Sequence, residues 1–412
     1  PVIDVFAERL EVLGFDVQVD DEPVEALAQW ADMVWQRNRA DALQKTAHPV
    51  GLIKGDAFLI VDWDQERGLP RFTFNKPDTI KPVYTDDGGL EYAVKSWTAR
   101  AVGAQNPEGR AVQRLNLFYP DRVEKYFRLH TDKGGWERWR DPGDTGWPVP
   151  WTAGDGAPLG VPVVHFRNKP LGGTFGRSEL RGVIPQSDAL NKQVIDLHDI
   201  LDTQAWPQRW ATGVPKDNAN LDSKPGETLH ADAPEARFGQ LDAADAKGVL
   251  DAIEQTISRI ARRSRTPLHL LTGGDFPSGE ALRSAEAGLV AKVLNAQVFF
   301  GNAWEDALTL GLRLQVEFGE APAQVDFDRL VVETRWSNPV SRSEADDKLW
   351  VEAADMAGAS RASMLERLGL DPEEEAEKKR SEQATLNEAA GRLLDAGAGA
   401  GMFGAGTVMA AA

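Results

Sequence analysis

The feature that most constrains the fold is a stretch of about forty residues without proline, 278–318. Apolar residues recur through it at helical spacing, which predicts one continuous helix beginning after a cap at Ser278. At 1.5 Å per residue such a helix is about 60 Å long, whereas the usual globular helix has about eleven residues. Gly288, Gly301 and Gly311 each weaken it by up to about 1 kcal/mol relative to alanine. The helix therefore needs packing along its length.

The chain has 412 residues, of which 42% are hydrophobic, and its length suggests two to three domains. It contains no cysteine, which excludes disulfides, thiolate metal sites and cysteine nucleophiles. Its six histidines are scattered, which argues against a histidine metal site. No run of eighteen apolar residues occurs and no signal peptide is visible, so no membrane partner is predicted. The chain begins at Pro1 inside an apolar pattern, and we expect residues ahead of it to be missing.

The formal net charge is −18. Such acidity argues against a sequence-reading DNA-binding protein, which needs a broad basic face. It is compatible with a protein past which DNA slides without sticking, because like charge repels the phosphate backbone.

The first part of the chain predicts mixed structure followed by a sheet region. Within residues 1–48 we expect a short helix, a short strand, and one longer helix over 22–47. Residues 55–168 contain short apolar or alternating runs separated by "DDGG", "DKGG" and "DPGDTG", which are turn chemistry. This pattern predicts an antiparallel sheet region.

The later part of the chain is mainly helical, so the fold class is α+β. Helices are predicted over 184–205 and 244–265, on either side of a loop-rich insert with two or three short strands. After the long helix, residues 324–336 alternate like a strand, and residues from 341 are helical again. The segment 395–412 is of low complexity and is expected to be mobile, or ordered only by contact with another molecule.

Motifs of enzyme chemistry are absent. No G-x-S-x-G elbow and no G-x-G-x-x-G after a strand occurs, and the glycines of "GGTFGRSEL" are too closely spaced for a phosphate loop. The acidic pairs fall in a turn and at predicted helix starts, where they complement the helix dipole. We therefore predict no enzyme, catalytic residue, cofactor or metal. A metal-dependent nuclease or hydrolase built from convergent carboxylates stays open as the less favoured alternative.

One local basic cluster comprises Arg259, Arg262, Arg263 and Arg265. The favoured interpretation is a helix C-terminus with positive charge and salt bridges to acidic neighbours. The functional alternative is contact with a polyanion, or between subunits, beside the following Gly-Gly loop.

The order of elements from 184 onward resembles the portal proteins of tailed double-stranded DNA bacteriophages, in the long-tailed branch. The resemblance rests on "GRSELRGVIPQSDALNKQV", "WPQRWATG", a second helix ending in "SRTP", "SGEALRSAEAGLVAKV", and "SRSEADDKLWVEAADMAGASRASMLERLGLDPEE". It covers nearly the whole chain, and "VIDVFAERLEVLGF" resembles a family segment that normally has a few tens of residues ahead of it.

The resemblance implies the portal fold, with these parts: 1–183 as the first part of a β-rich wing, 184–205 as stem helix 1, 206–243 as a small clip, 244–265 as stem helix 2, 266–277 as a tunnel loop, 278–340 as the long helix and return strand of the wing, 341–394 as a helical crown and 395–412 as a flexible tail.

The same resemblance implies function and partners. A ring of copies, typically twelve, would form the channel for packaging and ejection of viral double-stranded DNA at the capsid portal vertex of the virion. Its partners would be the major capsid protein, the terminase large subunit and a head-to-tail adaptor protein, with assembly in the host cytoplasm. A virion scaffolding or tail structural protein is the alternative, but the β-rich first half and Pro207, Pro215 and Pro225 argue against a simple helical scaffold.

The tunnel loop supplies the candidate DNA-channel residues: His269, Leu270, Leu271, Thr272, Gly273, Gly274, Asp275 and Phe276. The Gly-Gly pair gives this loop a hinge able to take positive φ. Since the loop is poor in cations, steric contact with DNA through Leu270, Leu271 and Phe276 is as plausible as electrostatic grip.

Overall fold

The computed structural model describes residues 1–100, 102, 106–129, 134–205, 209–214, 233–240, 246–273, 279–340, 344–358, 360–368, 375–376 and 378–380. The chain divides into two units, 1–340 and 341–412. In the second unit the described elements are α8 (Glu344–Met356) and α9 (Arg361–Leu368). The predicted cap at Ser341, most of the segment 369–394 and the segment 395–412 lie outside the described residues.

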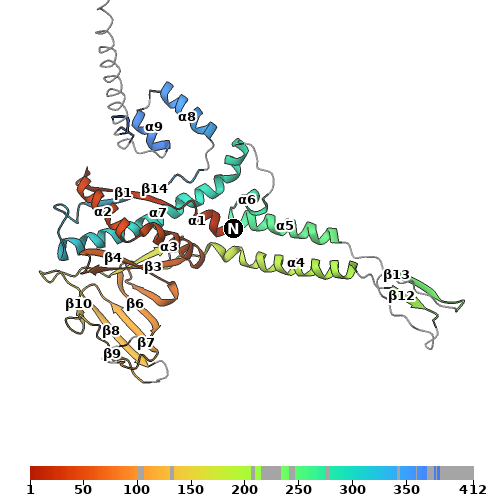
Figure 1. The fold of residues 1–412 in the computed structure, drawn as a ribbon, viewed down its shortest axis with the longest axis horizontal. Helices are drawn as coiled ribbons and strands as arrows, with labels where there is room; N and C mark the ends of the chain where they lie inside the picture. Colours follow the sequence, from red (N-terminus) through yellow and green to blue (C-terminus); the bar gives the residue numbers. More distant parts are fainter. Residues whose placement is uncertain are drawn as a thin grey trace, which may run out of the picture. The chain divides into compact units, whose positions relative to one another are not determined.

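The long helix is present as predicted: α7 (Gly279–Phe318) runs unbroken for 40 residues through the first unit (Figure 1). The predicted cap Ser278 lies outside the described residues. One stripe of α7 is fully buried, and Trp304 packs against the rings of Trp35 and Phe166 at centroid distances of 4.8 and 4.9 Å. The helix contacts β3, β4, β11 and β14, so the core of the first unit supplies much of the packing that a helix this long requires.

The N-terminal segment contains α1 (Val2–Ala7), β1 (Val12–Val19), β2 (Glu22–Pro23), α2 (Glu25–Arg37) and α3 (Ala40–Lys54). The single helix predicted over 22–47 was wrong, because the chain breaks at Arg39, whose φ is 51°. Asn38 explains the break: its side-chain nitrogen donates to the carbonyls of Val34 and Pro70, and its side-chain oxygen accepts from Phe72 N–H. A tertiary contact therefore ends α2 there.

The predicted antiparallel sheet region is confirmed, and it consists of two separate antiparallel sheets. One contains β3 (Asp56–Asp64), β4 (Leu69–Asn75) and β11 (Val163–Arg167) in the order β11-β3-β4. The other has the order β10-β8-β7-β6-β5, with β9 also paired to β8. Its strands are β5 (Ile80–Tyr84), β6 (Leu90–Ala99), β7 (Val112–Phe118), β8 (Arg122–Leu129), β9 (Glu137–Arg138) and β10 (Val149–Pro150).

The two sheets separate at Pro77–Thr79, a turn of 3-10 helix between β4 and β5. Proline supplies no backbone donor, so the β4 ladder ends there and the next strand starts a new sheet. A small apolar cluster fills the space between the sheets, formed chiefly by Phe58, Ile60, Ile80, Ala93, Phe118, Val123 and Val163. A third sheet joins β14 (Leu330–Trp336) to β1, so the strand predicted over 324–336 is confirmed in its second half.

Two helices flank the insert as predicted, namely α4 (Ile184–Ala205) and α5 (Ala246–Ser264). They pack side by side, and we call them the helical pair (Figure 1). Between them in sequence, β12 (Arg209–Thr212) and β13 (Arg237–Gln240) form an antiparallel ribbon. No helix in the described part of the chain is long and apolar enough to cross a membrane.

Candidate functional site

The segment predicted as a tunnel loop, 266–277, is partly helical. Residues Leu268–Thr272 form the short helix α6, which begins directly after Pro267. Gly273 ends it with φ of +64° and donates its N–H to the carbonyl of His269. The predicted positive φ is thus observed at Gly273, whereas Gly274, Asp275 and Phe276 lie outside the described residues. The expectation of a loop was wrong for 268–272, since proline at the position before a helix presets its first turn.

The α6 helix is held to the body of the chain through His269. Its Nε2 lies 3.8 Å from a carboxylate oxygen of Glu286 on α7, and both side chains are more than nine-tenths buried. Glu286 also forms an ion pair with Arg9, at 3.0 Å. Leu270 packs against the main core and Leu271 against the cluster that includes Ile260. Of the predicted channel residues that are described, only Thr272 and Gly273 are exposed.

A second buried ion pair joins α7 to the base of the helical pair. The Lys292 ammonium donates to Glu179 at 2.8 Å and to the carbonyl of Ser264, the last residue of α5, at 3.0 Å. Glu179 also binds Lys169 at 2.5 Å and accepts from the Asn168 amide. Burial lowers the pKa of Lys292. Burial opposes ionisation of Glu179 as well, but its cationic and amide partners outweigh it and leave the pKa of Glu179 lowered.

This junction was missed by sequence reasoning, although a signal was present. Glu286 precedes the apolar positions Leu289, Val293 and Ala296 on one face of α7, and Lys292 adjoins that face. A charged residue on an apolar helix face is expensive to bury unless it is paired. Such a residue therefore predicts a distant partner, but the sequence does not identify Arg9 or Glu179 as that partner.

The four arginines lie together at the C-terminal end of α5. Arg259, Arg262 and Arg263 belong to the helix, Arg265 follows it, and all four are exposed. Within the described residues none of them makes an ion pair, so the expected salt bridges to acidic neighbours are not found in that part of the chain. Arg263 instead lies over Gly182, where an added Cβ would come within 2.7 Å of its Nε.

Arg259 and Arg262 line a shallow surface hollow on α5 together with Asp251 and Glu254. The hollow thus presents both positive and negative side chains, and no ion pair joins them within the described residues. In this geometry the four arginines can contact a polyanion or an acidic surface of another subunit. Among the residues that the structure describes, no group of three or more histidines, aspartates or glutamates is arranged to hold a metal ion.

Comparison with known protein families and sequences finds similarity to phage portal proteins. The family model for the SPP1 Gp6-like phage portal protein matches residues 2–389. The portal protein of Mycobacterium phage L5 is 25% identical over 411 residues, covering 93% of this chain and 78% of that protein. The portal protein of Mycobacterium phage D29 is 26% identical over 372 residues, covering 84% of this chain and 71% of that protein.

Solved structures of gene transfer agent particles also contain similar chains. One, from the neck of an empty particle computed with C6 symmetry, has a TM-score of 0.47. Another, from the neck of a native particle computed with C12 symmetry, has a TM-score of 0.46. Each is 14% identical, with 90% of this chain and 89% of the other covered. Because the family model spans most of the sequence, the chain belongs to the SPP1 Gp6-like phage portal protein family and is a structural protein of the phage portal vertex.

Proposed function

We propose that copies of this chain assemble into a closed ring, of twelve copies, around a central channel that carries viral double-stranded DNA during packaging and ejection. Membership of the portal family supports the proposal. The observation that carries the ring assembly is an unpartnered apolar surface on the helical pair.

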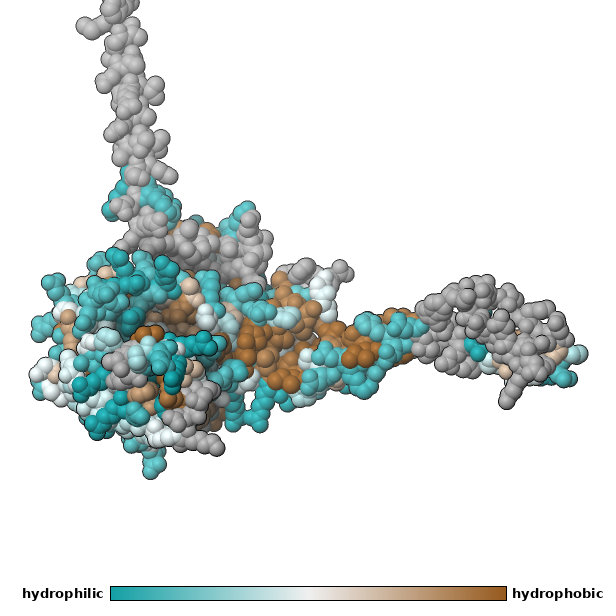
Figure 2. Space-filling view, turned by 60° about the horizontal axis from the view of Figure 1, so that its bottom comes forward, coloured by the Kyte–Doolittle hydropathy of each residue, from teal (hydrophilic) through white to brown (hydrophobic). Residues whose placement is uncertain are grey.

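Both helices of the pair keep large apolar side chains in solvent after packing against each other. They are Ile184 at 54%, Val194 at 36%, Ile195 at 60%, Leu201 at 46% and Leu250 at 47% relative exposure. Figure 2 shows this hydrophobic surface along the pair. Contiguous apolar surface of this kind on a highly charged chain marks an interaction face. In a ring, the helical pair of the neighbouring copy would cover it.

We assign the parts of the chain accordingly. Residues 1–183 and 278–340 form the wing, 184–205 and 244–265 the stem, 206–243 the clip, 266–277 the channel-facing segment, 341–394 the crown and 395–412 a flexible tail. The boundary between the two compact units after Val340 supports a separate crown.

The channel-facing segment is proposed to expose its later part to DNA. His269, Leu270 and Leu271 are turned into the body of the chain, so among the described residues Thr272 and Gly273 are the ones open to DNA. Twelve copies at −18 each carry a formal charge of −216. A channel with a share of this charge repels phosphate, so that DNA passes without being trapped.

The ring is further proposed to occupy the capsid vertex, contacting the major capsid protein, the terminase large subunit and later a head-to-tail adaptor protein. Assembly would take place in the host cytoplasm. The exposed arginines of α5 would face an acidic surface of the adjacent copy, since they have no ion pair within the described residues of one chain.

The assembly surface is tested by Ile195→Asp. A charged side chain at the centre of an apolar interface is costly to desolvate, so this variant should stay monomeric near 45 kDa while the wild type forms a large oligomer. Val102→Asp is the matched control, because Val102 is 77% exposed but lies in the connection between β6 and β7. Mass photometry at equal concentration measures the outcome. Assembly of the Ile195→Asp variant at the level of the Val102→Asp control would refute the proposed interface.

A further inference from the structure

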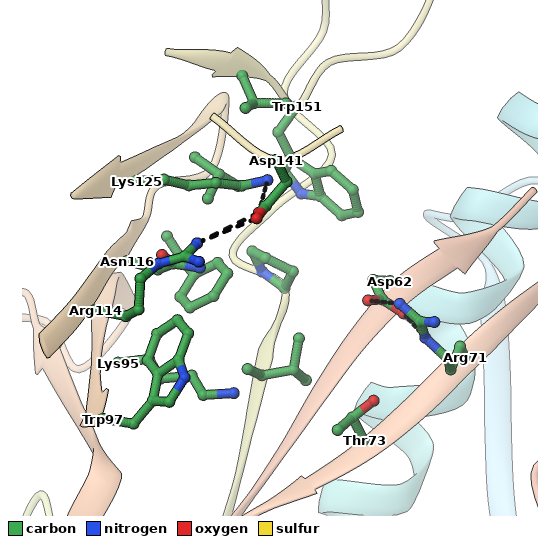
Figure 3. A pocket seen from close by; sticks show the side chains of 15 residues that line it. Asp62, Arg71, Thr73, Lys95, Trp97, Arg114, Asn116, Lys125, Asp141 and Trp151 are labelled. Carbon is green, nitrogen blue, oxygen red and sulfur yellow. Dashed lines mark hydrogen bonds and ion pairs between the residues drawn. The ribbon is translucent and has the colours of Figure 1, made fainter. Parts of the chain in front are cut away.

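A cleft of about 670 Å³, lined by both charged and apolar side chains, lies between the two sheets of the N-terminal region. One wall is formed by β6, β7 and β8, and the other by β3 and β4 (Figure 3). Phe118, Val123, Val149 and Trp151 supply an apolar lining. The volume lies within the range of small-ligand and peptide pockets.

Strand register lines up the polar side chains on the first wall. Lys95, Asn116 and Lys125 lie directly opposite one another on three neighbouring strands. In the next row Trp97 lies opposite Arg114. Side chains directly opposite across an antiparallel ladder have Cβ atoms about 5 Å apart, so this wall gathers three cations around a single amide.

Several polar groups on this wall lack a good hydrogen-bond partner. Only 6% of the Arg114 side chain is exposed, yet its Nε–H has no hydrogen-bond partner, and its Nη2 lies 3.4 Å from each carboxylate oxygen of Asp141. The Oδ1 of Asn116 is also buried without a partner. The charge of Lys125 is already paired, because its ammonium binds Asp141 at 2.9 Å and Asp144 at 2.7 Å.

Lys95 is the uncompensated charge of the cleft. Its ammonium lies 4.8 Å from the centroid of the Trp97 ring and makes no ion pair within the described residues. On the opposite wall, Asp62 already forms a bidentate ion pair with Arg71. Arg71 Nε donates to Oδ1 at 2.8 Å and Nη2 donates to Oδ2 at 2.6 Å. Burial lowers the pKa of both Lys95 and Arg114, as expected for cations that lack a sufficient counter-charge.

We propose that this cleft binds an extended segment of another protein that carries a glutamate or aspartate next to an apolar residue. The carboxylate would pair with the Lys95 ammonium, which is the partly exposed cation of this wall. The neighbouring apolar residue would lie on Phe118 and Trp151. Asp62 and Asp141 line the same cleft and repel a string of phosphates, so charge complementarity favours one carboxylate over nucleic acid. The proposal is independent of ring formation.

The first test uses the full chain and two capped peptides, acetyl-Leu-Glu-Leu-amide and acetyl-Leu-Gln-Leu-amide, in isothermal titration. We expect the glutamate peptide to bind about tenfold or more tightly than the glutamine peptide, because only the former has the charge-assisted contact. Lys95→Gln should remove this preference. Lys81→Gln is the matched control, since Lys81 is exposed on neighbouring β5 and does not line the cleft.

Equal binding of the two peptides, or an unchanged preference in Lys95→Gln, would overturn the proposal. The titration is repeated on assembled and on dissociated protein. Binding to assembled protein supports a partner of another kind, whereas binding restricted to dissociated protein means that a second copy covers the cleft and overturns that assignment.

A second test places the missing carboxylate in the wall. Asn116→Asp keeps the side-chain shape and puts a negative charge between Lys95 and Lys125, so the thermal midpoint should rise by on the order of 2 °C and binding of the glutamate peptide should be lost. Asn295→Asp is the control, at an exposed amide on α7, and should change neither. A lowered midpoint for Asn116→Asp with unchanged peptide binding contradicts an anion site.

Discussion

His48 illustrates how a single buried side chain is matched to the core of this protein. It is 1% exposed, and its Nδ1–H donates to the carbonyl of Leu10 at 3.0 Å. Its Nε2 accepts from the Trp304 indole N–H at 2.9 Å. Both ring nitrogens are therefore satisfied only in the neutral tautomer. Protonation of His48 would turn Nε2 from an acceptor into a donor, and it would then face the Trp304 N–H, which is also a donor. Burial lowers the pKa of His48 to about 4.

This depressed pKa predicts a loss of stability in mild acid. The folded protein binds fewer protons at His48 than the unfolded chain between pH 6.5 and about 4, so the stabilisation is complete above pH 6.5 and is lost as the pH falls toward 4. The loss from this residue amounts to about 3 kcal/mol. Thermal midpoints measured from pH 7.5 to 4 should fall more steeply for wild type than for His48→Asn, which lacks a titrating ring. Parallel curves for the two proteins would exclude His48 as the cause.

The pair of Lys292 and Glu179 gives a second prediction at this scale. Lys292→Met leaves Glu179 buried with fewer partners and should cost about 3 kcal/mol of unfolding free energy. Adding Glu179→Gln removes the unpaired charge. The double variant should therefore lose less unfolding free energy than the sum of the losses of the two single variants, by at least about 1 kcal/mol. Chemical denaturation followed by circular dichroism measures the cycle. Additive losses would mean that the two side chains do not interact.

Sequence alone predicted some of these residues and not others. The positive φ of Gly273 was predicted from its residue type alone, because glycine adopts this conformation without steric cost. The partners of Glu286 and Lys292 could not be predicted, since Arg9 and Glu179 lie far away in the sequence. Pairing between polar residues this far apart in sequence depends on the tertiary structure, which helical periodicity does not predict.

Among the elements, the long helix α7 and the helical pair were predicted almost to the residue, because periodicity and flanking prolines define them locally. The break between α2 and α3 escaped prediction, since Asn38 is bonded to β4. The division into two sheets was also missed. Alternating runs predict strands but not which strands are neighbours.

The end of α6 is the element at which a designed change is most informative. Gly273→Pro removes the N–H bonded to His269 and forbids the observed φ of +64°, so it should disturb the channel-facing segment. Gly273→Asn is the control because asparagine tolerates this conformation, and no atom of the described residues beyond the chain neighbours lies within 4 Å of the position where its Cβ would be.

We expect both variants to form the same oligomer, and only the proline variant to fill heads with DNA at a reduced level. The measurement is DNA content per particle in an infection complemented with each variant. Full packaging by Gly273→Pro would show that the hinge is dispensable.

At the scale of the whole molecule, the acidic composition, the compact body and the exposed apolar helical pair have a common explanation in a ring. The body supplies the packing for α7, while the surface of the helical pair is left for a neighbouring copy. Composition could exclude a broad basic DNA-reading face, and the pattern of elements indicated the family. The number of copies is a property of the interface between chains, which a single sequence does not specify.

The most direct test of the ring is electron microscopy of the purified full chain, with class averages viewed along the symmetry axis. The account predicts closed rings of twelve copies with a central opening wide enough for double-stranded DNA, lined by the helical pairs and residues near Gly273. Particles that remain single chains at every concentration, or closed assemblies without a central opening, would contradict it.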